Sequence, residues 1–140
     1  MEQKKNSGIR IMTRKERYEY LVSEVGTVQH ELRTANTEET INKALDKLSK
    51  LAGRMCRDIQ LADVNDWVTD IQGTICAVKL HDCTRSTLDE LLNLFLERVR
   101  KIITEENKKE NEKKLELLFE MLAENADKIA EMIDTTKIFG

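Results

Sequence analysis

The amino-acid sequence predicts an all-α fold: an up-and-down bundle of about five helices with a disordered basic arm at the N-terminus. The 140-residue chain contains no proline, the residue that interrupts helices because it lacks an amide donor and clashes with the preceding turn. Apolar residues recur at spacings of three and four from Tyr18 to Ile133, as they do along one face of a helix. The connections between these stripes are short, which favours antiparallel neighbours.

Length and composition indicate one small helical domain. A chain of 140 residues buries about two-thirds of its unfolded surface. Apolar residues make up 40% of the chain, charged residues 35% and aromatic residues only 4%, so we expect a core of Leu, Ile and Val. We predict a flexible basic arm over residues 1–12, a single bundle domain over residues 13–134 and a short tail over residues 135–140.

Two capping boxes predict where the first two helices begin, because a polar cap exchanges hydrogen bonds with the residue three positions on. Thr13 and Glu16 open the first helix, which should end near Thr34, and Asn36 and Glu39 open the second. The first helix carries the stripe Tyr18, Leu21, Val22, Val25, Val28 and Leu32. The second carries Ile41, Ala44, Leu45, Leu48, Leu51, Ala52, Met55 and Ile59.

Polar caps also predict where the third and fourth helices begin. Asp63 can cap a third helix, and Thr87 with Glu90 can cap a fourth after a loop over residues 81–86. The third helix carries Val64, Trp67, Val68, Ile71, Ile75 and Val78. The fourth carries Leu88, Leu91, Leu92, Phe95, Val99, Ile102 and Ile103.

The relation between the fourth stripe and the last one predicts a break in the chain. Leu122 follows Phe95 by 27 residues, which places it about 180° around the axis of a straight helix. The two stripes would therefore face opposite ways. We therefore predict a break over residues 107–111 and a fifth helix with Leu115, Leu118, Phe119, Leu122, Ala126, Ile129 and Ile133. The alternative is one continuous helix whose two halves bury against different partners, as in a swapped dimer.

Surplus apolar residues on the last two helices indicate a binding surface. Leu94 and Leu96 flank the stripe of the fourth helix, which is therefore apolar around more than half its girth. Apolar surface beyond what one core needs is typical of protein interfaces. The residues that we predict to bind a partner are Leu91, Leu94, Phe95, Leu117, Met121 and Met132.

The sequence thus predicts a small non-enzymatic helical interaction module, an adaptor, regulator or inhibitor that occupies the surface of another protein. A homodimer through the last two helices is one form of this hypothesis. Compact, highly charged helical chains of this kind are common among phage accessory proteins. We predict no catalytic residue and no cofactor, because the chain has no glycine-rich phosphate loop, nucleophile elbow or Ser–His–acid set.

A basic N-terminal segment supports an alternative function. Residues 1–17 carry six basic residues against Glu2 and Glu16, whereas the remainder carries 17 basic and 24 acidic residues. Such an arm can neutralise phosphates. The alternative is a nucleic-acid-associated accessory subunit that binds through Lys4, Lys5, Arg10, Arg14, Lys15 and Arg17.

Paired carboxylates support a second, less favoured alternative. Glu16 and Glu19 on the first helix and the Asp63, Asp66 and Asp70 series on the third can supply oxygen ligands for Mg²⁺. This ExxE and DxxD pattern resembles that of all-α nucleotide pyrophosphohydrolases, although here a complete helix separates the two motifs. The resemblance implies a Mg²⁺-dependent nucleotide hydrolase, whereas Asp63 is better explained as a helix N-cap.

The spacing of the cysteines and histidines does not predict a metal site. Cys56, Cys76, Cys83 and His81 lack the close four-ligand spacing of a structural zinc site, so we interpret the thiols as small buried hydrophobes and predict no metal. An odd cysteine count and the lack of a secretory leader favour a cytoplasmic protein. No apolar run reaches the roughly 18 residues of a membrane span.

One short segment resembles a phosphotransfer motif. His30-Glu31-Leu32-Arg33-Thr34 is similar to the core of the H-box of sensor histidine kinases, in which a helical histidine accepts a phosphoryl group. The family continues with Pro and Leu, whereas Ala35 and Asn36 follow here, and no glycine-rich ATP-binding segment comes after them. We interpret His30 as a solvent-facing surface residue.

Overall fold

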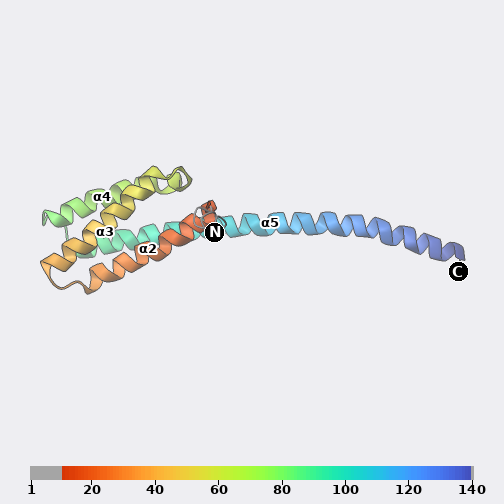
Figure 1. Cartoon of the computed structure of the whole chain (residues 1–140), viewed down its shortest axis with the longest axis horizontal. Helices are drawn as coiled ribbons and strands as arrows, with labels where there is room; N and C mark the ends of the chain where they lie inside the picture. Colours follow the sequence, from red (N-terminus) through yellow and green to blue (C-terminus); the bar gives the residue numbers. More distant parts are fainter. Residues whose placement is uncertain (1–10, 140) are drawn as a thin grey trace, which may run out of the picture. The chain divides into compact units, whose positions relative to one another are not determined.

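The computed structural model describes the backbone of residues 11–139 and the side chains of residues 11–131 (Figure 1). Over these residues the chain forms four α-helices, one 3₁₀-helix and no strand. The elements are α2 (Arg14–Thr34), α3 (Glu38–Arg57), the 3₁₀-helix η1 (Ile59–Val64), α4 (Asn65–Lys79) and α5 (Arg85–Phe139). The all-α class is confirmed, and the expected count of about five helices is corrected to four. Of the arm expected over residues 1–12, only Ile11 and Met12 fall within the described residues.

The chain divides into two compact units, the first ending at Ile103 and the second beginning at Thr104. In the first unit α2, α3, α4 and the start of α5 run alternately in opposite directions, as short connections require (Figure 1). This arrangement supports the bundle class. The second unit consists of the remainder of α5. A single domain over residues 13–134 stays a prediction.

The first helix begins where the sequence predicts. The Thr13 hydroxyl accepts a hydrogen bond from the Glu16 amide at 3.1 Å, and the Glu16 carboxylate accepts one from the Thr13 amide at 3.0 Å. This reciprocal pair satisfies two amides that no helical carbonyl can reach. The predicted capping box is therefore confirmed.

The second and third helices begin elsewhere than predicted. The capping box of α3 joins Thr37 and Thr40, one position beyond Asn36 and Glu39, with both amide-to-hydroxyl distances at 3.1 Å. Asp63 does not cap α4, because it lies inside η1, and α4 starts after Val64 with no side-chain cap. The interruption between α3 and α4 is a 3₁₀-helix, which periodicity alone did not reveal.

The predicted break over residues 107–111 is wrong, because α5 is continuous from Arg85 to Phe139. This helix begins before Thr87 and includes residues 135–139, where a separate tail was expected. A break is needed only if both apolar stripes face one core. In the structure residues 107–131 are all exposed within the chain, so their stripe is not constrained to face the core of the first unit.

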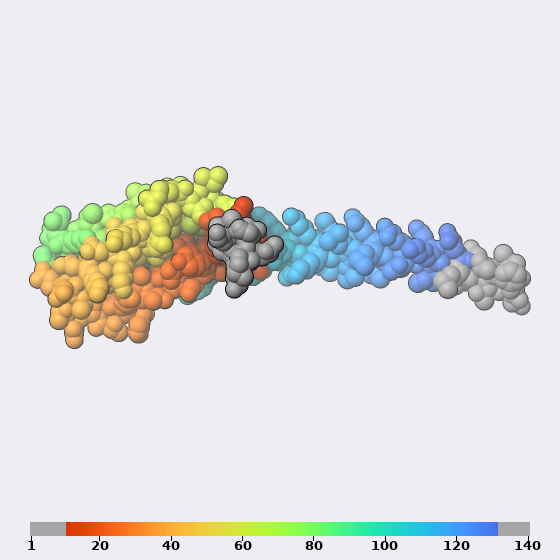
Figure 2. Space-filling model, viewed as in Figure 1, coloured from red at the N-terminus to blue at the C-terminus, as the bar shows by residue number. Residues whose placement is uncertain are grey.

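One hydrophobic core fills the first unit and takes residues from every helix in it. On one face the side chains of α2, α3 and α4 lie together and close over this core (Figure 2). Tyr18 from α2 and Phe95 from α5 are its largest members, and both are fully buried. The expectation of an aliphatic core is met by the rest of the cluster, whose most deeply buried members are Val25, Leu45, Leu48, Ala52, Val64, Val68, Ile71, Leu88, Leu92 and Val99.

A polar cluster also joins α2 to α5. Gln29, which is only 5% exposed, donates from Nε2 to Asp89 Oδ1 at 3.1 Å and to Asn93 Oδ1 at 2.8 Å. Arg33 binds the same Asp89 carboxylate with two nitrogens, at 2.7 and 3.0 Å. Burying an amide without hydrogen-bond partners costs free energy. These contacts therefore favour the one register of α5 against α2 in which the Gln29 amide is paired.

Candidate protein-interaction surface

The second unit presents a stripe of apolar side chains that nothing in the chain covers among the described residues. Its members lie within an arc of about 100° on the helix. Each large one is about half exposed or more, from 49% for Leu118 to 64% for Phe119. We define the α5 seam as Leu115, Leu118, Phe119, Leu122, Ala126 and Ile129.

A second group of apolar side chains lies beside the seam. Leu117 and Met121 are each 59% exposed and occupy the adjacent arc of the same helix. We call these two residues the α5 flank. Met132, which the sequence places with them, lies outside the residues whose side chains are described.

The fourth-helix residues predicted to bind a partner are not brought together on the surface. Phe95 is fully buried in the core, and Leu91 is partly buried and packs against that core. Phe95 therefore offers no accessible surface and Leu91 only a minor part of its own, because folding already uses their apolar surface. Leu94 is 51% exposed. Within the first unit, only Leu94 of the three remains accessible as predicted.

The polar face of the second unit is acidic. Between residues 115 and 131 the chain carries five acids and only one base, Lys128. At about 100° per residue, the five acids fall on the side of the helix away from the seam. They are Glu116, Glu120, Glu124, Asp127 and Glu131. The second unit is therefore an amphipathic helix whose apolar arc is open and whose opposite arc is negative.

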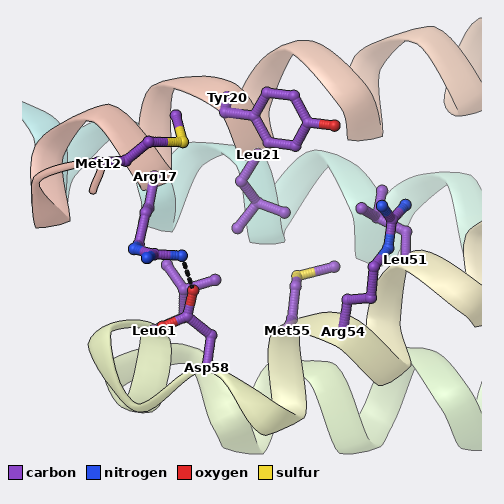
Figure 3. Close-up of a pocket in the computed structure, with 9 residues that line it drawn as sticks. All are labelled: Met12, Arg17, Tyr20, Leu21, Leu51, Arg54, Met55, Asp58 and Leu61. Atoms are coloured by element: carbon purple, nitrogen blue, oxygen red, sulfur yellow. Dashed lines mark hydrogen bonds and ion pairs between the residues drawn. The ribbon is translucent and has the colours of Figure 1, made fainter. Parts of the chain in front are cut away.

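The first unit contains a separate small pocket of about 180 Å³ between α2, α3 and η1 (Figure 3). At one end the Arg17 guanidinium points toward the Asp58 carboxylate, with 2.6 Å between Nη1 and Oδ2, and Arg54 lies at the other end. The apolar lining comes from Met12, Leu21, Leu51, Met55 and Leu61.

Sequence reasoning missed this pocket, because it arises where three elements meet, and no single helix pattern contains it. Its lining residues include no histidine, cysteine or hydroxyl nucleophile other than the Tyr20 phenol, which donates to Glu24 at 3.0 Å. Such a lining can hold a small apolar group beside the ion pair of Arg17 and Asp58.

The carboxylates considered for Mg²⁺ are occupied or dispersed. Asp63 forms an ion pair with Arg14, and Glu16 is engaged in its capping box. Asp66 and Asp70 are exposed on α4. Within the described part of the chain, no three His, Cys, Asp or Glu side chains are grouped so as to hold a metal ion.

The thiols differ from their sequence interpretation. Cys56 and Cys76 are exposed and Cys83 is partly buried, so the interpretation as buried hydrophobes is wrong for the first two. At about 100° per residue, Cys56 lies about 20° beyond the edge of its helix stripe and Cys76 about 80° beyond, so helix position alone indicates that Cys76 faces solvent. His30 is exposed on α2, as its helix position indicated.

The basic segment considered for nucleic acid is described only in part. Lys4, Lys5 and Arg10 lie outside the described residues. Arg14 pairs with Asp63, and Arg17 pairs with Asp58. Ion pairing to the chain's own carboxylates reduces the positive charge that these two arginines offer to a phosphate.

Comparisons of the chain with protein-family models, curated proteins and solved structures found no match. Among the helices of the described residues, none combines the length and the apolar character needed to cross a membrane.

Proposed function

We propose that this protein is a small non-enzymatic helical interaction module, which acts by occupying the surface of a partner protein through the C-terminal part of α5. One observation carries the proposal. Between Leu115 and Ile129, seven large apolar side chains are each about half exposed or more in the described structure. Exposed apolar patches of this kind are typical of binding sites, whereas single exposed hydrophobes are ordinary.

The energy available from this surface is sufficient for binding. Removing the remaining exposed half of one Leu-sized side chain from water contributes about 1 kcal/mol. Seven such side chains and a comparable apolar face on the partner together offset an association cost of roughly 4–15 kcal/mol. The surface therefore supports a specific complex only when the partner supplies an apolar groove or helix of its own.

The shape of the surface favours helix-in-groove recognition. An amphipathic helix places residues spaced by three and four into an apolar groove, and the α5 seam and the α5 flank both have this spacing. Met121 adds a flexible, polarisable side chain that adapts to an irregular partner surface. The acidic arc opposite the seam stays in water in such a complex.

The α5 flank provides the test. Leu117→Glu combined with Met121→Glu places two charges on the binding surface without touching the core of the first unit. Affinity capture from the native host with the wild-type chain should recover a partner that this variant loses. Circular dichroism should show the same helicity in both proteins, because both side chains are exposed.

A matched double substitution on the acidic arc, Glu120→Ala with Glu124→Ala, controls for general effects on α5. This control should capture the partner as the wild-type chain does. Equal recovery by the flank variant would contradict the proposal. Unfolding of the flank variant would also contradict it, because the flank would then be part of a core.

The nucleic-acid alternative is separated from this proposal by salt dependence. A chain that neutralises phosphates binds a short duplex with an affinity that falls steeply as salt increases. Titration of the intact chain and of a chain lacking residues 1–12, at two salt concentrations, tests this directly. Salt-dependent binding lost with residues 1–12 would favour the accessory-subunit function.

A further inference from the structure

We propose that the α5 seam pairs with the same seam of a second copy of the chain, parallel and in register, with Asn125 as a polar layer inside the pairing. This inference rests on the proposed function, because it names one occupant for part of the same surface. It assigns the seam to the second copy, and the heterologous partner then binds the paired helices with the α5 flank at the edge of its contact.

The spacing of the seam is that of a coiled coil. Leu115, Leu122 and Ile129 recur every seven residues, and Leu118 and Asn125 stand three residues after the first two. Alternating intervals of three and four keep one face of a helix against a partner helix over several turns. The four apolar members are all about half exposed within the chain, and Asn125 is exposed as well, so the whole face is available.

The charges beside this face fit a second copy. In a heptad frame that begins at Leu115, the five acids of residues 115–131 all fall on the outer positions, away from the pairing. The positions that flank the seam hold Phe119 and Ala126 on one side and Met121 and Lys128 on the other. In-register pairing therefore brings no two carboxylates together. Pairing with a different helix is usually specified by complementary flanking charges, and Lys128 is the only flanking charge here.

Asn125 distinguishes the second copy from an apolar partner helix. An amide buried against an apolar side chain loses its hydrogen bonds with water and gains none. A parallel copy in register places Asn125 against its own equivalent, where each amide can both donate and accept. An antiparallel copy on the same core positions places Asn125 against Leu122 and leaves the amide unpaired. A single asparagine at the first core position of a heptad sets register and strand number, and we place Asn125, at the second core position, in the same role.

The sequence also limits where the pairing begins. One heptad before Leu115 and Leu118, the corresponding positions hold Lys108 and Asn111. A lysine at a core position disfavours pairing, because its charge is strongly hydrated. The paired segment therefore starts at Leu115 and lies wholly within the second unit.

Self-association of the full chain tests the pairing. Sedimentation equilibrium over a range of protein concentrations should show two copies for the wild-type chain. Leu118→Glu with Leu122→Glu should weaken this association at least about a hundredfold, because four glutamates then meet in one seam. The single flank variant Leu117→Glu should associate as the wild-type chain does, since position 117 lies on the outer side of the paired helices. A wild-type chain that stays monomeric, or a seam variant that still associates, would overturn the proposal.

Disulfide crosslinking tests the orientation. In a full-length background with serine at Cys56, Cys76 and Cys83, Leu122→Cys should form a disulfide with its own equivalent in a second copy. Crosslinking only between a Leu122→Cys chain and an Asn125→Cys chain would show antiparallel pairing and overturn the parallel register.

The two proposals fail in different ways. If the chain stays monomeric but still captures a heterologous protein through the flank, the pairing is refuted and the proposed function stands. If the flank variant captures that protein as well as the wild-type chain does, the proposed function is refuted whatever the oligomeric state.

Discussion

Asp89 is the acceptor on which the polar contact between α2 and α5 depends. The two hydrogen bonds from Arg33, with a smaller contribution from Gln29, hold the pKa of the Asp89 carboxyl below its ordinary value, although partial burial acts in the opposite direction. The folded protein therefore binds this proton less readily than the unfolded chain does. The stabilisation is fully present above the unfolded pKa of about 3.9 and is lost as the pH falls through the lower folded pKa.

This linkage gives a prediction for Asp89→Asn. The variant should be less stable than the wild-type chain at pH 7, because Arg33 loses its ionised partner while Gln29 keeps an acceptor. The difference in the free energy of unfolding, measured with urea at pH values from 7 down to 2.5, should shrink below about pH 4. A difference that stays constant over this range would show that the Asp89 charge does not stabilise the fold.

At the scale of single residues, the sequence predicted local contacts and missed distant ones. Thr13 and Glu16 are three positions apart, so their capping box is visible in the sequence and is confirmed. Asp63 also satisfied a local rule for helix caps, yet its carboxylate pairs with Arg14, a residue 49 positions away. Pairs of this kind depend on how helices pack, which no spacing along the chain encodes.

The helix ends show how one element holds the next. Arg85, at the start of α5, donates from Nη1 to the Leu32 carbonyl at 2.9 Å and to the Ala35 carbonyl at 2.7 Å. The last carbonyls of a helix have no amide partner within it, and they form the negative end of its dipole. Arg85 therefore both caps the C-terminal end of α2 and fixes the loop that follows.

We predict that Arg85→Met destabilises the first unit by about 1–2 kcal/mol, because two charge-assisted hydrogen bonds and the interaction with the helix dipole are lost. Urea denaturation measures the change. Lys109→Met is a suitable control on the same helix, since that residue is exposed beyond the first unit and should change stability little. Equal effects of the two substitutions would show that the Arg85 contacts contribute nothing specific.

The continuity of α5 shows what an apolar pattern can and cannot predict about an element. The pattern correctly predicted helix on both sides of residues 107–111, and the two stripes are out of phase as the sequence indicated. It failed at the break because it required both stripes to face one core. The segment Glu105–Lys114 contains no residue that stops a helix, so local propensity continues the helix when the second stripe is free of the core.

At the scale of the whole molecule, the predicted surface divides between folding and binding. The sequence predicts that Phe95 and Leu117 belong to one binding surface, because the fourth helix is apolar around more than half its girth and the fifth carries apolar residues beyond its main stripe. The structure buries Phe95 completely and leaves Leu117 59% exposed. Sequence periodicity cannot make this distinction, because it reports that a residue is apolar on one face and not whether its own chain covers that face.

This division leads to a prediction about the intact chain. The core runs from Tyr18 to Ile102, so deleting residues 108–140 removes none of its members and keeps one turn of α5 beyond them. We expect the free energy of unfolding to change by no more than about 1 kcal/mol, whereas Phe95→Ala in the full chain should cost about 3–5 kcal/mol. The truncated protein should lose both self-association and capture of the heterologous partner, because the α5 seam and the α5 flank are gone. If truncation instead unfolds the first unit, residues 13–134 are a single cooperative domain, and the apolar stripe of α5 serves folding and not binding.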